Sequence, residues 1–144
     1  MILVLPILAF IATADQVRIQ GDWVMVEQTT PDGTVLSYPK GPQPIEHYNL
    51  HVRGNRATLR YDWMEPNDEV EMTFALNPAR GEVDFTVVGC TFPQLKKGDA
   101  RESLYKFDGG ALVLCDADFV QKRPAEFKVG GKVRTYKFAR AKKP

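Results

Sequence analysis

The sequence predicts an all-β protein: a single antiparallel up-and-down barrel of about eight strands. Eight or nine segments of strand length follow one another along the chain. Turn signals rich in Gly, Pro and Asn separate these segments, and no convincing helical pattern interrupts them. A β-sandwich fits the same count, but short connections between consecutive segments favour a meander, and closing it removes exposed strand edges.

The composition restricts the class of protein further. The chain has 144 residues, which suits one domain with one hydrophobic core. Its formal net charge is +1, and no run of basic residues is interleaved with aromatic ones. We therefore expect no nucleic-acid partner.

The first fourteen residues are apolar, carry no charge and end in Ala12-Thr13-Ala14. This small-x-small ending is typical of a signal peptidase site, so we predict a signal peptide at residues 1–14 and a barrel domain at residues 15–144. A truncated start site and an uncleaved anchor are the alternatives. The segment is shorter than the roughly 20 apolar residues that a membrane-spanning helix needs. We expect a secreted or periplasmic protein with no membrane span after cleavage.

The first half of the chain predicts four strands, each bounded by turn residues. They lie at residues 17–27, 34–38, 45–53 and 56–63. Pro31-Asp32-Gly33 marks the first turn, and the Pro-rich residues 39–44 form a loop because they cannot pair inside a sheet. Gly54-Asn55 is a two-residue hairpin signal.

The second half predicts five more strands. They lie at residues 70–76, 83–87, 104–107, 111–116 and 134–140. Asp108-Gly109-Gly110 predicts a tight hairpin, because two consecutive glycines supply the positive φ values that such a turn requires. Arg123-Pro124 indicates a corner and Gly130-Gly131 a turn before the final strand.

Apolar and aromatic residues alternate along most of these strands, which places them on the inner wall of a barrel. They would line a ligand cavity or fill the barrel completely, since an interior of about eight strands does both. The candidate ligand-binding residues are Tyr48, Leu50, Tyr61, Met72, Phe74, Phe85, Tyr105, Phe107, Leu114 and Tyr136.

Cys90 and Cys115 are the only cysteines. An even count in an exported chain suggests a disulfide bond. The strand around Tyr105 would separate the two strands that carry them, whereas bridged Cα atoms lie within about 7 Å. A disulfide and two buried thiols therefore remain as alternatives.

The polar residues assemble no reaction centre. His47 and His51 would lie roughly 13 Å apart on a strand, too far to share one metal ion. Neither Ser37 nor Ser103 occurs in a nucleophile-elbow pattern. We expect no enzyme activity, no metal site and no cofactor.

Asp116 and Asp118, with Glu126 nearby, follow the strand at residues 111–116. Their spacing is not that of an EF-hand loop. We interpret them as solvated carboxylates at a polar strand end, in preference to an acid–base pair or a cation site.

Gly21-x-Trp23 in the first strand and Arg140 in the last resemble the lipocalin-like superfamily, in which such a Trp closes one end of the barrel and such an Arg packs across it. Further motifs make the chain similar to an uncharacterised, planctomycete-type family of secreted bacterial lipocalin-like domains. They are Leu76-Asn77-Pro78 with Val83-Asp84-Phe85, the run from Leu104 to Cys115, and Arg123 to Phe127. The resemblance implies a lipocalin-like barrel, a secreted habit and barrel closure by Trp23 and Arg140, but no known reaction.

Together these observations predict a non-catalytic extracytoplasmic domain that binds a small apolar or amphipathic molecule in its barrel. The alternative is a structural or protein-interaction module with a filled barrel and no ligand. The sequence identifies no protein partner. A cavity would separate the two hypotheses.

Overall fold

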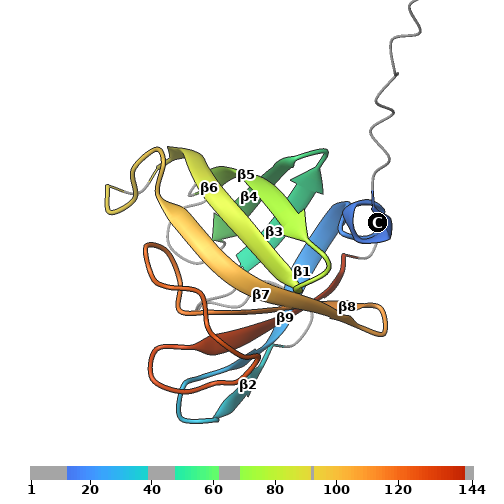
Figure 1. Cartoon of the computed structure of the whole chain (residues 1–144), viewed down its shortest axis with the longest axis vertical. Helices are drawn as coiled ribbons and strands as arrows, with labels where there is room; N and C mark the ends of the chain where they lie inside the picture. The colour runs from blue at the N-terminus through green and yellow to red at the C-terminus, as the bar shows by residue number, and fades with distance from the viewer. Residues whose placement is uncertain (1–12, 39–47, 62–68, 92, 142–144) are drawn as a thin grey trace, which may run out of the picture.

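The computed structural model describes residues 13–38, 48–61, 69–91 and 93–141. Eight of its strands form a closed antiparallel up-and-down barrel, as predicted, and one further strand lies outside (Figure 1). The strands are β1 (Gly21–Thr29), β2 (Val35–Ser37), β3 (Tyr48–Arg53), β4 (Arg56–Tyr61), β5 (Glu69–Asn77), β6 (Glu82–Cys90), β7 (Ala100–Asp108), β8 (Ala111–Asp116) and β9 (Arg134–Arg140).

The barrel closes where the first and last strands pair. From β3 onwards each strand pairs with the next one in the sequence, and β9 returns to pair with β1. The opposite edge of β1 is shared, because its first residues pair with β3 and its last residues, from Glu27 to Thr29, pair with β2. A register shift between Met25 and Glu27 bends β1 along its pairing with β9.

Two of the predicted hairpins form where the glycines indicated them. Gly54 joins β3 to β4 with a φ of 61°, and Gly109 joins β7 to β8 with a φ of 60°. Both values lie in the left-handed region that glycine adopts without steric cost.

The chain enters the barrel differently from the prediction. Residues assigned to the start of the first strand form a short helix, α1 (Ala14–Arg18), and its Val17 side chain is exposed. The Thr13 side chain caps α1 by accepting a hydrogen bond from the backbone nitrogen of Gln16 at 3.1 Å. The predicted cleavage point, between Ala14 and Asp15, lies within this helix. No helix among the described residues is long and apolar enough to cross a membrane.

The core lies inside the barrel wall, where the inward side chains of the strands meet. Of the candidate interior residues, those with buried side chains are Leu50, Met72, Phe74, Phe85, Tyr105, Leu114 and Tyr136. Phe107 is partly buried and packs against them. Tyr48 and Tyr61 pair across β3 and β4, but their side chains lie outside the described part, as does His47.

We name the two ends of the barrel after the residues that occupy them. The Trp23 end is where β1, β4, β6 and β8 begin, and α1 packs beside it (Figure 1). The Arg101 end is where these strands finish and where β7 and β9 begin. It also carries the loop at residues 117–133, which joins β8 to β9.

This loop folds back along the outer wall of the barrel. Arg123 fixes it there, donating to the backbone oxygen of Ser103 at 2.7 Å and pairing with Glu82 at 3.3 Å and with Asp84.

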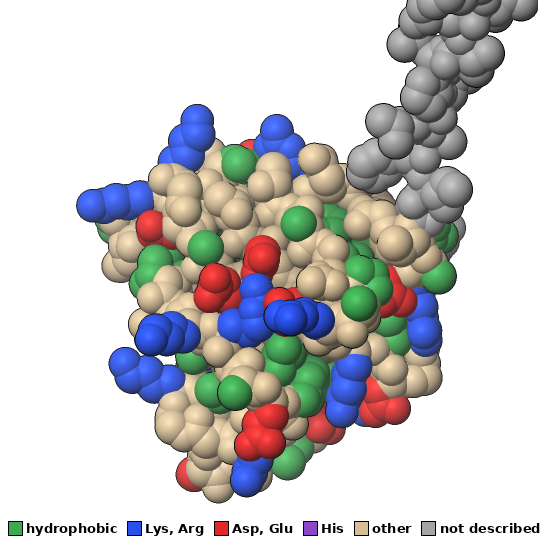
Figure 2. Space-filling view, viewed as in Figure 1, with side chains coloured by type: hydrophobic (Ala, Val, Ile, Leu, Met, Phe, Trp, Pro, Cys, Tyr) green, Lys and Arg blue, Asp and Glu red, His purple; other side chains and the backbone are tan. Residues whose placement is uncertain are grey.

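Figure 2 shows basic and acidic side chains interleaved on the face that it views, so this face carries no field of a single sign.

Candidate functional site

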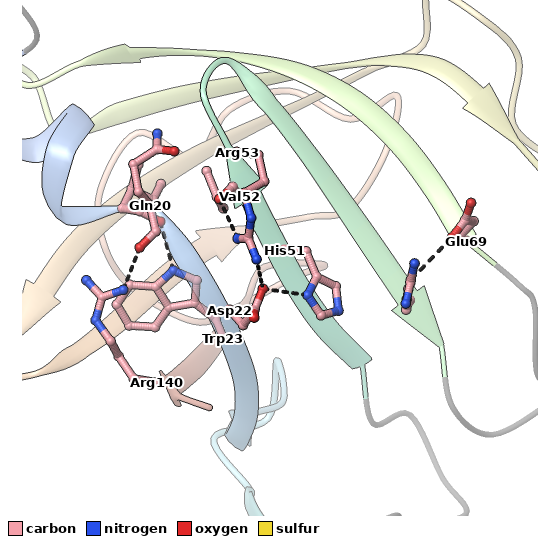
Figure 3. A network of polar contacts seen from close by, with 10 residues as sticks. Gln20, Asp22, Trp23, His51, Val52, Arg53, Glu69 and Arg140 are labelled. Atoms are coloured by element: carbon pink, nitrogen blue, oxygen red, sulfur yellow. Dashed lines mark hydrogen bonds and ion pairs between the residues drawn. The ribbon is translucent and has the colours of Figure 1, made fainter. Parts of the chain in front are cut away.

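A stacked Trp–Arg pair occupies the Trp23 end. Trp23 is buried and donates its indole N–H to the backbone oxygen of Ile19 at 2.9 Å. The guanidinium carbon of Arg140 lies 4.3 Å from the centre of the indole ring. Arg140 also donates to the backbone oxygen of Gln20 (Figure 3) and to that of Arg18, so it joins the last strand to the segment that leads into β1.

Gly21 is required by this arrangement. Its φ of 119° is unfavourable for residues with a side chain, and a Cβ atom there would lie only 2.8 Å from Nη1 of Arg140. The Gly21-x-Trp23 motif therefore has a physical basis. The glycine makes room for the guanidinium that covers the tryptophan.

The Arg101 end holds charges inside the barrel. Arg101 donates through Nε and Nη2 to the two carboxylate oxygens of Asp116, at 2.9 and 3.1 Å. Only 3% of the Arg101 side chain and none of the Asp116 side chain is exposed. Asp116 also accepts from the Ser103 hydroxyl at 2.7 Å and from the Asp118 backbone nitrogen at 2.9 Å.

Two aromatic rings pack against the Arg101 guanidinium. Its carbon lies 5.0 Å from the ring centre of Tyr136 and 5.4 Å from that of Phe119, and both side chains are buried. Burial raises the pKa of the Tyr136 hydroxyl to about 12, so it stays protonated at neutral pH. We call Arg101, Ser103, Asp116, Phe119 and Tyr136 the Arg101 cluster.

The chemistry of this cluster favours binding over proton transfer. Both carboxylate oxygens of Asp116 already accept hydrogen bonds, from Arg101, Ser103 and the Asp118 backbone, and no part of the side chain is exposed to a reactant. The ion pair itself is costly to bury, and an apolar pair of similar volume is often as stable. What the cluster offers is a fixed polar anchor within an otherwise apolar wall, as in sites for small molecules.

The sequence interpretation of the strand end was wrong for Asp116. It assigned Asp116 to solvent because of its residue type, whereas the alternation Leu112, Leu114, Asp116 continues on the inner face. Asp118 and Glu126 are exposed, as expected. The same alternation along β7 places Arg101, Ser103 and Tyr105 on the inner face, and this pattern in the sequence indicated the cluster.

Cys90 and Cys115 form no disulfide bond in this structure. β7 lies between β6, which ends at Cys90, and β8, which carries Cys115. Cys115 is buried, and this burial raises the pKa of its thiol. Of the two alternatives, the structure therefore holds the pair of thiols.

The Asp22 network is a second set of charges, on the outer wall near the Trp23 end. Asp22 accepts from Nδ1 of His51 at 2.8 Å and from Arg53 at 2.9 Å (Figure 3). The hydrogen bond from His51, assisted by Arg53, lowers the pKa of the Asp22 carboxyl. Among the described residues, no group of three or more His, Cys, Asp or Glu side chains could hold a metal ion.

Comparisons with known proteins give no relative from which a function could be transferred. No protein-family model matches the chain. Neither a curated protein nor a solved structure matches it either. The function has to be argued from the site alone.

Proposed function

We propose that this protein is a non-catalytic lipocalin-like barrel that binds a small amphipathic molecule at its Arg101 end. One observation carries the proposal: a fully buried ion pair lies inside an apolar barrel, at the end opposite the Trp23–Arg140 closure. Binding sites combine mostly apolar walls with a few fixed polar groups. The apolar leader and the resemblance to secreted lipocalin-like domains support an extracytoplasmic location.

The arrangement of the two ends supports entry of the ligand at the Arg101 end. At the Trp23 end, α1, Trp23 and Arg140 cover the interior with backbone hydrogen bonds that tie three segments together. At the Arg101 end, Phe119 packs over the cluster from a loop. A loop exchanges its contacts more easily than a strand that is bonded on both sides.

A filled-barrel interaction module is the second candidate. Phe74 and Phe85 pack against each other within the barrel, with ring centres 6.3 Å apart. Tyr38 and Leu95 also pack against the core. A barrel filled in this way would act through its outer surface and would hold no ligand.

Native mass spectrometry of the protein purified from its own host, before and after extraction with organic solvent, tests the proposal. We expect an extra mass that extraction removes. A double variant, Arg101→Met with Asp116→Leu, replaces the ion pair by apolar groups, which is often neutral for stability, and should lose that mass. Arg140→Met, at the opposite end, should retain it. A bare protein mass and no binding of an apolar fluorescent probe would instead establish the filled-barrel module.

A further inference from the structure

The loop that leaves β8 contains a strained turn at the Arg101 end. Asp118 and Val120 have φ values of 76° and 56°, and they are the only non-glycine residues in the described part of the chain with positive φ. This conformation is unusual for a β-branched residue such as valine. Val120 is also 64% exposed, so burial of its side chain does not offset the strain.

The turn directs one side chain inward. The Val120 backbone nitrogen donates to the oxygen of Ala100 at 2.8 Å, and the Phe119 nitrogen donates to the Asp118 carboxylate at 2.8 Å. Phe119 lies between these two exposed residues, yet it is only 8% exposed itself. The strained backbone thus serves to place this ring against Arg101.

The other residues of the Arg101 cluster are carried by strands, and the loop adds two contacts to them through Asp118: its backbone nitrogen donates to Asp116 at 2.9 Å, and its carboxylate lies 3.8 Å from Arg101. Arg101 and Ser103 belong to β7, Asp116 ends β8, and Tyr136 belongs to β9. Beyond the turn, Arg123 fixes the loop to the outer wall. Among the described residues, the segment 117–122 would therefore have to move to uncover one face of the guanidinium, and it would give up the contacts of Asp118 with Asp116 and Arg101 and the hydrogen bond from Val120 to Ala100.

We propose that Phe119 is a displaceable plug, and that the subsite it fills takes a planar aromatic group of the ligand, stacked on the Arg101 guanidinium. This inference rests on the proposed function, whose amphipathic ligand it specifies as aromatic. A guanidinium face favours aromatic rings over aliphatic chains of similar size, and that of Arg101 already contacts the rings of Phe119 and Tyr136. Strain in the turn weakens the plugged state, so a ligand can compete with the ring.

Calorimetric titration with two neutral probes, 2-naphthol and octan-1-ol, tests this inference. Phe119→Ala removes the plug, and we expect it to bind 2-naphthol at least about fivefold more tightly than the wild type, because apparent affinity rises with the open fraction. The affinity of this variant for octan-1-ol should rise by a smaller factor. Phe127→Ala is the matched control: this residue of the same loop stacks on Lys106 at 4.4 Å, and the variant should bind as the wild type does.

A second variant acts in the opposite direction. Val120→Asn places a residue that tolerates positive φ at an exposed position, which relieves the strain only in the plugged state. We expect about fivefold weaker binding of 2-naphthol, the factor that corresponds to the lower end of such strain energies. This variant decides the matter if Phe119→Ala does not fold, and affinity equal to that of the wild type would overturn the plug.

The remaining outcomes separate this inference from the function on which it rests. If the wild type binds 2-naphthol and the affinity of Phe119→Ala rises no more than that of Phe127→Ala, Phe119 is not a plug, but the proposal that the barrel binds a small molecule is retained. An equal gain for octan-1-ol would overturn the aromatic subsite. If neither probe binds to any of the chains, the inference and the proposed function fail together.

Discussion

The two ends of the barrel use the same interaction, an arginine stacked on aromatic rings, for different purposes. Arg140 lies over Trp23 at the surface, so water still reaches its charge. Its hydrogen bonds to backbone oxygens join β9 to the segment that precedes β1. Arg101 lies inside, and Asp116 is its bidentate partner. A cation at the surface stabilises a closure cheaply, whereas a cation inside the wall needs carboxylate partners, here Asp116 with two hydrogen bonds and Asp118 at 3.8 Å.

The largest expected effect comes from removing that carboxylate. Asp116→Ala removes the bidentate partner of the buried Arg101 charge and leaves it the weaker contact with the exposed Asp118 carboxylate, at 3.8 Å, so it should lower the free energy of unfolding by about 3 to 5 kcal/mol. The measurement is urea denaturation followed by tryptophan fluorescence. The Arg101→Met, Asp116→Leu pair should regain most of this loss. A cost below about 1 kcal/mol for Asp116→Ala would show that the buried charge is solvated, and the contrast between the ends would disappear.

A smaller effect is expected at the Trp23 end. Gly21→Ala combines an unfavourable φ with a Cβ atom 2.8 Å from Arg140, and it should cost about 1 to 3 kcal/mol. Gly33→Ala is the control, because Gly33 also has a positive φ, of 89°, but a Cβ atom there would meet nothing within 4 Å. Chemical denaturation of both variants separates the steric contact from the backbone strain. Equal losses would mean that Arg140 yields without cost.

The smallest effect belongs to the exposed Asp22 network. Asp22→Asn should cost only about 0.2 to 1 kcal/mol at neutral pH, because water and salt screen its pairs with His51 and Arg53. The folded protein lowers the pKa of Asp22 below its ordinary value of 3.8. The stabilisation that the Asp22 carboxylate gives to the fold is therefore present above about pH 4 and disappears as the pH falls through the lowered pKa.

Unfolding of the wild type and of Asp22→Asn, measured between pH 7 and pH 2, checks this sign. The difference between the two chains should shrink towards zero in acid. It should also shrink in 1 M salt at neutral pH. A difference that persisted undiminished at pH 2 would contradict the assignment of the network as a set of surface pairs.

The strand order was predictable from the sequence because its signals are local. Gly54 and Gly109 mark hairpins by their own conformational freedom, and the alternation of apolar residues determines which side of each strand faces inward. The helix α1 was not predictable in this way. Five residues are too few for a helical period to be visible, and the cap from Thr13 and contacts such as Gln20 to Gly54 hold the segment.

The Arg101 cluster was missed for a different reason. Charged residues are usually exposed, but this rule does not hold for Asp116, to which the strand register brings the buried Arg101 as a partner. Arg101 alternates with less buried residues along β7, and Asp116 lies two residues beyond the core residue Leu114 on the neighbouring strand, so both lie on the inner face. Phe119 was beyond prediction, since its inward direction depends on the backbone of a turn that lacks glycine.

The pairing of β1 with β9 also determines the order of assembly. The strands from β3 to β8 follow one another through hairpins or shorter connections, which give local contacts that close quickly, whereas the loop at residues 117–133 separates β8 from β9. The seam joins the beginning of the described chain to its end, as in the pair of Trp23 with Arg140. Until Arg134–Arg140 has been synthesised, β1 and β8 each present an unpaired edge to other chains. The nascent protein is therefore most exposed to aggregation just before its last strand becomes available.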